Sequence, residues 1–428
     1  MSAWSIVIAI LLLGILAAFH EIGHFFVAKW LKVPVEEFSI FVGPSLFSWK
    51  KKGVKYHIRL FPFGAYVRYK GMEEEELDET DPEMFFNQPR WKRLLISLAG
   101  PFMNFLISMV IFAVIFSSFG FLSTKLGEIS EGTQLYETSA VRGDRIISVN
   151  GQRILTTLDL GYFYTMTPDT ESLEVTFRSA ATGELYNVTL VPDITEGYRL
   201  GITRDGAYKI SSVDPLSNGG EPGLLIGDIL ISANGVLASN EAFSAVVSES
   251  NGNPVTVIVI REEKEIEMEI KTIPYQIGNP RGMTLQSGSG IGEVLEQSVS
   301  FPVSYIRLSI SILADMVTGK VAPQDTLAGP LGIITVVSDV VDAEGVDFRE
   351  KVEQMGILAG VISVALAFSN LLPIPGLDGN SMVLLLVEMV RGKKLSIKAE
   401  MVINVVGFVC LILLAGFALF SDIFRLVG

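Results

Sequence analysis

The chain has 428 residues, of which 49% are apolar and only 19% charged, and its formal net charge is −14. Soluble domains carry about 25% charged residues, so this composition argues against a purely cytosolic globular protein. The apolar content also excludes a disordered chain, and a single cysteine excludes a disulfide scaffold. The net negative charge argues against nucleic acid as a partner.

The first apolar segment, residues 3–28, is long enough to cross a membrane, which takes roughly 20 apolar residues in a helix. No basic region precedes it and no small-residue cleavage site follows it. We therefore expect a membrane span here rather than a cleaved signal peptide.

Three ionisable residues interrupt this span: His20, Glu21 and His24, which form an HExxH motif. On a helix both imidazoles lie on one face and can bind a single Zn²⁺, with Glu21 beside them as general base. The alternative is a chance match of histidines packed in a core. Each ionisable group inside a span costs about 2.5–3.5 kcal/mol and is functional by default, so the motif favours a metal site.

Residues 29–93 carry 12 Lys and Arg, which predicts a cytoplasmic loop before a second span at residues 94–122. The N-terminus and residues 123–350 then lie on the outer side. Alternating apolar positions in residues 54–70 indicate a hairpin that turns at Pro62-Phe63-Gly64. His57 lies in this segment, and we expect an exposed strand residue there rather than a metal ligand.

Residues 125–300 are acidic, with 24 Asp and Glu against 12 Lys and Arg, and they contain an internal repeat. Gly143-Asp144 and Asn150-Gly151 return 84 residues later as Gly227-Asp228 and Asn234-Gly235. Each Asn-Gly pair indicates a hairpin turn with positive φ. The two copies, residues 124–195 and 199–275, resemble PDZ domains, which bind extended peptides by strand addition. The alternative is a pair of spacers without a ligand.

Residues 293–318 have helical apolar spacing, which fits either a helix on the outer membrane surface or one packed on the repeat domains. A third span is expected at about residues 355–372 and a fourth at about 401–420. A short basic loop at residues 391–398 precedes the fourth span and agrees with a cytoplasmic position.

A motif with two prolines and two glycines, Asn370–Gly379, interrupts the apolar region between residues 355 and 390. Broken backbone at membrane depth is tolerated where it lines a wet cavity. The HExxHxxGxxH pattern of soluble enzymes is absent, since position 27 is Val and position 30 is Trp. Asp378, inside the break, is therefore the candidate third zinc ligand.

HExxH in the first span and NxxPxPxLDG in a late span together resemble the site-2 protease family of intramembrane zinc metalloproteases. Three further stretches are similar to motifs of that family: Pro62–Val67, Ala99–Phe105 and Gly329–Ile333. The resemblance implies that His20, His24 and Asp378 hold zinc and that Glu21 activates water. It also implies substrate contacts at Asn370, Gly64 and Tyr66, although Asn370 is equally well explained as a cap at the helix break.

The resulting expectation is an α-helical membrane protein with about four transmembrane helices, a membrane-associated hairpin and two outer PDZ-like domains. Its parts are residues 1–122 with the first two spans, 124–195 and 199–275 with the repeats, 290–350 as an amphipathic connection, and 351–428 with the last two spans. The expected activity is Zn²⁺-dependent cleavage of single-span proteins in the bacterial inner membrane, after their outer parts are trimmed. The alternative is a catalytically silent membrane adaptor that displays PDZ domains.

Overall fold

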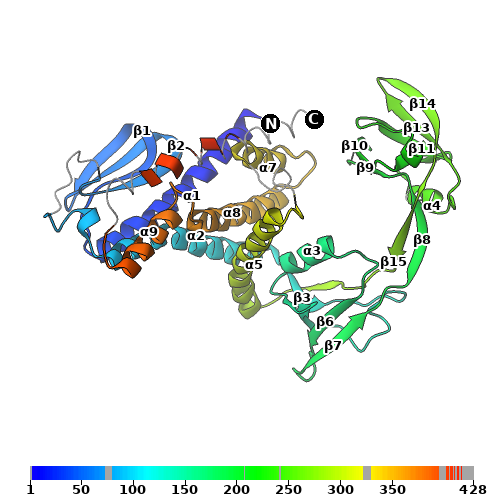
Figure 1. Ribbon diagram of the computed structural model, residues 1–428, viewed down its shortest axis with the longest axis horizontal. Coiled ribbons are helices and arrows are strands. Elements are labelled where there is room, and N and C mark those ends of the chain that lie inside the picture. Colours follow the sequence, from blue (N-terminus) through cyan, green and yellow to red (C-terminus); the bar gives the residue numbers. More distant parts are fainter. Residues whose placement is uncertain are drawn as a thin grey trace. The chain divides into compact units, whose positions relative to one another are not determined.

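The computed structural model describes residues 2–72, 80–206, 208–240, 242–321 and 329–394, together with isolated positions between 402 and 416. It divides into two compact units. The first comprises Met1–Ser123, Leu155–Asp159 and Ser287–Gly428, and the second comprises Thr124–Ile154 and Leu160–Gln286. The first unit holds the long helices, and the second holds most of the repeat (Figure 1).

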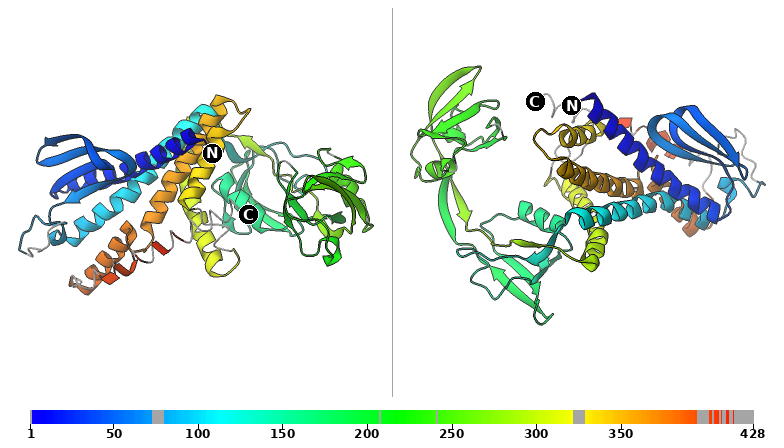
Figure 2. Two further views of the ribbon diagram at one scale, coloured as in Figure 1. Left: turned by 90° about the horizontal axis from the view of Figure 1, so that it is seen from above. Right: turned by 180° about the vertical axis from the view of Figure 1, so that it is seen from behind.

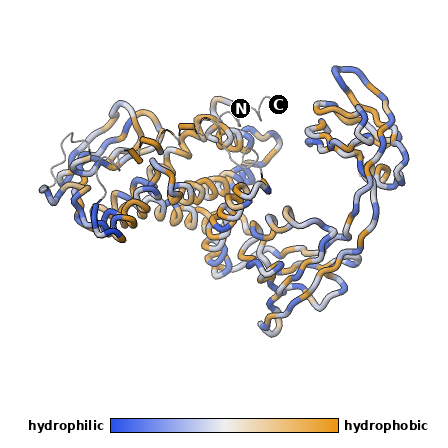
Figure 3. Tube along the Cα trace, viewed as in Figure 1, coloured by the Kyte–Doolittle hydropathy of each residue, from blue (hydrophilic) through white to orange (hydrophobic). Residues whose placement is uncertain are grey.

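Four helices of the first unit are long and apolar enough to cross a membrane: α1 (Ala3–Trp30), α2 (Arg90–Phe119), α5 (Ile291–Val317) and α8 (Phe348–Leu371). Apolar residues follow one another along α1, α2 and α8 (Figure 3). Three of these helices match expected spans, and the expected span at residues 401–420 lies mostly outside the described residues. Two shorter helices among the described residues of this unit are α7 (Pro330–Asp342) and α9 (Asp378–Arg391).

The helix α5 packs on α2 and α8, and it also contacts the first repeat, as one of the two alternatives predicted, because Ser304 Oγ donates a 2.6 Å hydrogen bond to Asp159 Oδ2. The ring of Phe301 lies 4.5 Å from that of Phe112, which is fully buried in α2. Phe112 in turn covers Gly360 of α8, where an added Cβ would come within 2.7 Å of its ring. Length and composition make α5 a further candidate span, and the position of this helix relative to the membrane surface stays a prediction.

A long hairpin, β1 (Val35–Lys51) and β2 (Val54–Tyr69), follows α1 (Figure 2). The sheet is present as predicted. The chain turns at Lys52-Gly53, where φ is 49° and 85°, and again at the predicted Pro62-Phe63-Gly64, where Gly64 has φ of 75°. Residues 37–40 of β1 pair in parallel register with residues 55–58 and in antiparallel register with residues 65–68, so the two halves of β2 run in opposite directions. These two arms do not pair with each other, because residues 37–40 of β1 lie between them.

The second unit contains two similarly ordered sheets, β16-β3-β4-β6-β7 and β12-β11-β13-β14, and β5 pairs with β4. All four residues of the Asn150-Gly151 and Asn234-Gly235 turns have positive φ, as predicted. Each copy has its own apolar core. The remaining strands and short helices are β3 (Leu122–Leu126), β4 (Arg145–Val149), β5 (Gln152–Arg153), α3 (Thr157–Met166), β6 (Leu173–Arg178), β7 (Leu185–Leu190), β8 (Ile194–Arg199), β9 (Ile202–Arg204), β10 (Ile210–Val213), η2 (Ser217–Gly220), β11 (Ile229–Ala233), β12 (Val236–Leu237), α4 (Phe243–Ser248), β13 (Val255–Arg261), β14 (Lys264–Ile270), β15 (Ile273–Gly278) and β16 (Leu285–Ser287).

The aspartate of each Gly-Asp pair fastens its copy of the repeat internally. Asp144 accepts hydrogen bonds from the Tyr186 hydroxyl and from the backbone amides of residues 141 and 180. Asp228 accepts two from the guanidinium of Arg261, at 2.8 and 2.7 Å. Burial by itself would raise the pKa of both carboxyls, but these hydrogen bonds bring each pKa below its usual range. The repeated motif is therefore structural.

Candidate metal centre

The HExxH motif lies in the last third of α1, where His20 and His24 stand one turn apart on the same face. Both histidines are buried, at 9% and 7% exposure. Close contact with α2 explains this burial, because an added Cβ on Gly23 would lie 2.3 Å from the carbonyl oxygen of Ala99. The two helices can meet at this distance only with glycine at position 23.

Asp378 reaches the same place from the other end of the chain. The helix α8 ends at Leu371, and the loop that follows contains two prolines and Gly376, whose φ of 96° turns the backbone. Asp378 then opens α9. Gly379 fits closely behind it, since an added Cβ would lie 2.3 Å from the carbonyl oxygen of Leu372.

Three potential ligand atoms converge there. Asp378 Oδ2 lies 3.0 Å from His20 Nε2 and 3.3 Å from His24 Nε2, and the two Nε2 atoms are 3.1 Å apart. Ligand atoms about 2.0–2.1 Å from a tetrahedral Zn²⁺ stand about 3.3 Å from one another. The separations and the donor types both fit a zinc ion with three protein ligands. Among the described residues, this trio forms the His/Cys/Asp/Glu cluster able to hold a metal.

The surroundings of His24 favour the same role. Its Nδ1 lies 2.7 Å from the carbonyl oxygen of Ile96, to which it can donate its hydrogen. That hydrogen bond fixes the tautomer and leaves Nε2 free to bind a metal. Gly100, one turn further along α2, gives the imidazoles room, because an added Cβ would lie 2.3 Å from His24 Nε2 and 2.7 Å from His20 Nε2. The sequence singled out Ala99-Gly100-Pro101 as a motif but gave no reason for this glycine.

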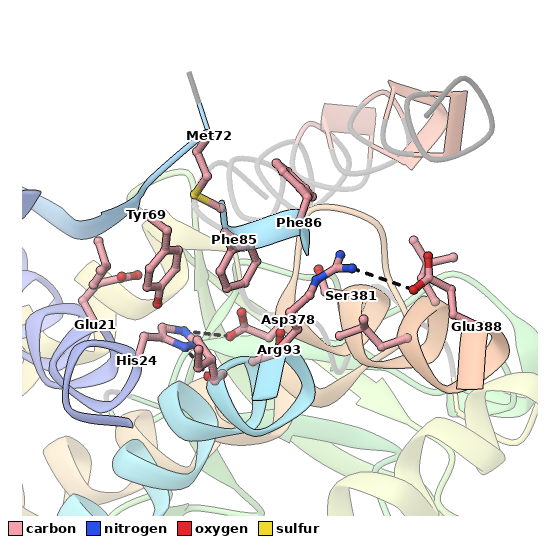
Figure 4. A pocket seen from close by; sticks show the side chains of 15 residues that line it. Glu21, His24, Tyr69, Met72, Phe85, Phe86, Arg93, Asp378, Ser381 and Glu388 are labelled. Atoms are coloured by element: carbon pink, nitrogen blue, oxygen red, sulfur yellow. Dashed lines mark hydrogen bonds and ion pairs between the residues drawn. The ribbon is translucent and has the colours of Figure 1, made fainter. Parts of the chain in front are cut away.

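The trio opens into a cavity of about 330 Å³, whose lining includes Glu21, His24 and Asp378 (Figure 4). Val67 of β2 lines the same cavity as Glu21. Val67 and Tyr69 form the wall on the side of the hairpin, and the short helix η1 (Phe85–Asn87) contributes aromatic rings. Glu21 thus lies beside the metal ligands and faces an accessible space, as expected for a general base.

At its other end the same cavity holds a buried ion pair that sequence reasoning missed. Oε2 of Glu388 lies 3.8 Å from Arg93 Nη1 and 3.5 Å from Arg90 Nε, and the Glu388 side chain is 5% exposed (Figure 4). Removing one partner of such a pair leaves an uncompensated buried charge. The available signal was an ionisable residue within the mostly apolar stretch that follows Asp378 on α9.

Three expected substrate contacts are not among the described residues that line the cavity. Nδ2 of Asn370 donates a 3.0 Å hydrogen bond to the carbonyl oxygen of Leu366, which fits the cap alternative. Gly64 forms the bend of β2, and the hydroxyl of Tyr66 donates to Glu37. Their roles toward substrate stay predictions.

His57, which we expected to be an exposed strand residue and not a ligand, lies in β2 as expected. Its side chain is only 17% exposed, however, because Nε2 lies 3.5 Å from Glu37 Oε1 and Nδ1 lies 3.0 Å from Ser45 Oγ. Contacts within the sheet therefore account for His57, and it lies outside the His20, His24 and Asp378 cluster.

Comparison with known proteins gives one family for nearly the whole chain. The model of peptidase family M50 matches residues 8–414. The "Putative zinc metalloprotease CA_C1796" of Clostridium acetobutylicum is 29% identical over 97% of this chain and 96% of its own. Protease RseP of Yersinia pestis is 27% identical, and the regulator of sigma-E protease RseP of Escherichia coli 26%, each over 99% of both chains.

Proposed function

This chain belongs to peptidase family M50, and from that premise we propose that it is a zinc-dependent intramembrane protease of the site-2 type. The observation that carries the proposal is the convergence of His20, His24 and Asp378, whose ligand atoms lie 3.0–3.3 Å apart although the chain separates Asp378 from the histidines by more than 350 residues. Relatives that match nearly full-length are named zinc metalloproteases, which supports zinc as the metal.

The residues of this chain divide the hydrolysis among themselves. His20, His24 and Asp378 hold the metal. Zinc bound there would supply Lewis acidity, which activates water and polarises the scissile carbonyl. Glu21 takes one proton from the attacking water and passes it to the departing amine nitrogen as the C–N bond breaks, so that one peptide and one water yield a carboxylate and an amine.

The substrates we propose are single-span membrane proteins whose outer part has already been trimmed, such as anti-sigma factors or remnant signal peptides. A helical peptide must unwind before its carbonyl can reach the metal, and an unwound segment needs partners for its backbone groups. The outer part of β2, residues 64–69, lies next to Glu21 and is suited to strand addition. Gly64 and Tyr66 would then contact substrate through their backbone, and Asn370 would stand near the other side of the peptide.

We further propose that the two repeats are PDZ domains on the outer, periplasmic side of a bacterial inner membrane, with the metal toward the cytoplasmic side. The acidic composition of residues 125–300 and the basic loop at 29–93 support this orientation. The repeats would exclude bulky substrates by size or bind their newly made C-termini. A catalytically silent adaptor is the second candidate, but no observation favours it, because Glu21 and all three ligands are present.

Replacement of the base tests the proposal. Glu21→Gln keeps all three ligands, so it should retain zinc and lose cleavage of a transmembrane substrate by about 100-fold or more, the usual worth of a general base. Glu350→Gln, on the exposed first turn of α8, is the matched control and should leave both unchanged. Zinc content and cleavage are measured together in proteoliposomes. Wild-type cleavage by Glu21→Gln would refute the assigned role.

A further inference from the structure

The hairpin contains a buried carboxylate that the proposed chemistry does not use. Glu37 of β1 is 4% exposed. Its Oε1 accepts hydrogen bonds from Arg59 Nη2 at 2.8 Å and from the Tyr66 hydroxyl at 2.5 Å. Its Oε2 accepts one from Arg68 Nη2 at 2.6 Å. One carboxylate of the central strand thus fastens both flanking halves of β2, since Arg59 lies in the first half and Tyr66 and Arg68 in the second.

Alternation along β2 separates this network from the cavity. Tyr66 and Arg68 point to the face that carries Glu37, whereas Val67 and Tyr69 point to the opposite face, where they line the cavity. Strand register agrees, because Ser39, Phe38 and Glu37 pair in turn with residues 66, 67 and 68. The side chains on either side of Val67 are therefore held by Glu37, while Val67 itself lines the cavity together with Glu21.

The negative charge of Glu37 strengthens its hydrogen bonds to β2. Burial by itself would raise the pKa of Glu37, but hydrogen bonds from Tyr66 and Arg59 and the charge of Arg68 bring it below its usual range. Glu37 is thus ionised at neutral pH and makes charge-assisted hydrogen bonds, which are about twice as strong as neutral ones. A strand held at residues 66 and 68 has little freedom at residue 67.

We propose that Glu37 and Tyr66 are positioning residues of the protease, which hold the backbone of residues 66–68 in place as the cavity wall beside the carboxylate of Glu21. The inference rests on the proposed role of Glu21 as general base. It assigns the hydroxyl of Tyr66 to Glu37 and not to the substrate, which leaves only the backbone of residue 66 for substrate contact.

The two roles of Tyr66 predict different kinetics. Tyr66→Phe removes only the hydroxyl. A misplacement of about 1 Å costs about 100-fold in rate, so partial loosening of the strand should lower kcat by about 10-fold with KM and zinc content unchanged. Tyr56→Phe is the matched control, because Tyr56 lies on the same sheet and its ring stacks on Trp49 at 5.3 Å. It should keep the wild-type kcat.

A second variant, Glu37→Gln, completes a double-mutant cycle with Tyr66→Phe. Glu37→Gln leaves two guanidinium groups without their anion, so its folding is checked by zinc content, and Tyr66→Phe serves alone if it fails to fold. In the Glu37→Gln background, Tyr66→Phe should cost less than 2-fold in kcat, since both changes break one network. Four outcomes would overturn the inference. In the double variant, the losses of kcat could be fully additive. In Tyr66→Phe, kcat could be unchanged or KM could rise with a normal kcat, and Tyr56→Phe could lose as much kcat as Tyr66→Phe.

Failure of the inference and failure of the proposed function give different results. An inactive Glu21→Gln together with an unaffected Tyr66→Phe would refute only the positioning role. A fully active Glu21→Gln would refute the proposed base, and with it the reason for holding the wall beside that carboxylate.

Discussion

Replacing Asp378 by asparagine is the sharpest test of the metal centre, because this ligand was assigned across the longest stretch of sequence. The change keeps the size of the side chain and removes its charge. Oδ2 lies 3.0 and 3.3 Å from the two imidazole Nε2 atoms, so it belongs to the ligand set itself. Mutation of residues that hydrogen-bond to a metal ligand typically lowers metal affinity by about 10–100-fold. Loss of the charge on the ligand itself should therefore lower zinc affinity by at least about 100-fold, or about 2.7 kcal/mol.

The assay measures zinc content and cleavage side by side in the purified protein. Asp339→Asn is the matched control, because it is the same substitution at an exposed position of α7 in the same unit. Glu388→Gln does not serve as a control, because the carboxylate of Glu388 lines the same cavity and pairs with Arg93 there and with Arg90 beside it. Normal zinc content and cleavage in Asp378→Asn would refute the assignment.

Three further outcomes are expected. A chelator such as 1,10-phenanthroline should abolish cleavage and added Zn²⁺ should restore it; full activity in metal-free protein would contradict the zinc assignment. Gly100→Ala should lower zinc content by about 10-fold or more, since the new Cβ would lie 2.3 Å from His24 Nε2, whereas Gly161→Ala, with nothing within 4 Å, should not. Because the pKa values of Asp144 and Asp228 lie below their ordinary value of 3.8, both residues stabilise the repeats above that pH, and the stabilisation is lost as pH falls through the lowered values. Circular dichroism should show acid unfolding of the repeats below about pH 4, and equal stability at pH 2 and 7 would contradict this.

Much of the architecture followed from local patterns. Apolar length predicted the helices that became α1, α2 and α8, and the repeated Gly-Asp and Asn-Gly pairs predicted two similar sheets with positive φ at each turn. Helical spacing by itself placed His20 and His24 on one face. These inferences succeeded because each depends on neighbours within a few residues, where backbone geometry is set by residue type.

The hairpin shows where local patterns stop. Prolines and Gly64 indicated a turn, and the chain does turn there, but residues 37–40 of β1 lie between the two arms of β2, which therefore do not pair with each other. Which strands pair depends on which apolar faces are buried against each other, and the alternation of residues within one segment does not show this. The resemblance that implies a substrate contact at Tyr66 likewise could not show that the hydroxyl of Tyr66 is held by Glu37, whereas Val67 and Tyr69 face the cavity.

The sequence by itself determined the ligand types, the break that carries Asp378 and the helix that carries both histidines. Only the tertiary structure decided that Asp378 lies 3.0 Å from His20, that Gly100 leaves room for the imidazoles, and that Glu388 shares their cavity. The physical reason is distance along the chain. Periodicity fixes the direction of a side chain relative to its own helix or strand, whereas contacts between residues hundreds of positions apart depend on how helices pack, and that is set by close approach at glycines and by the shapes of many buried side chains.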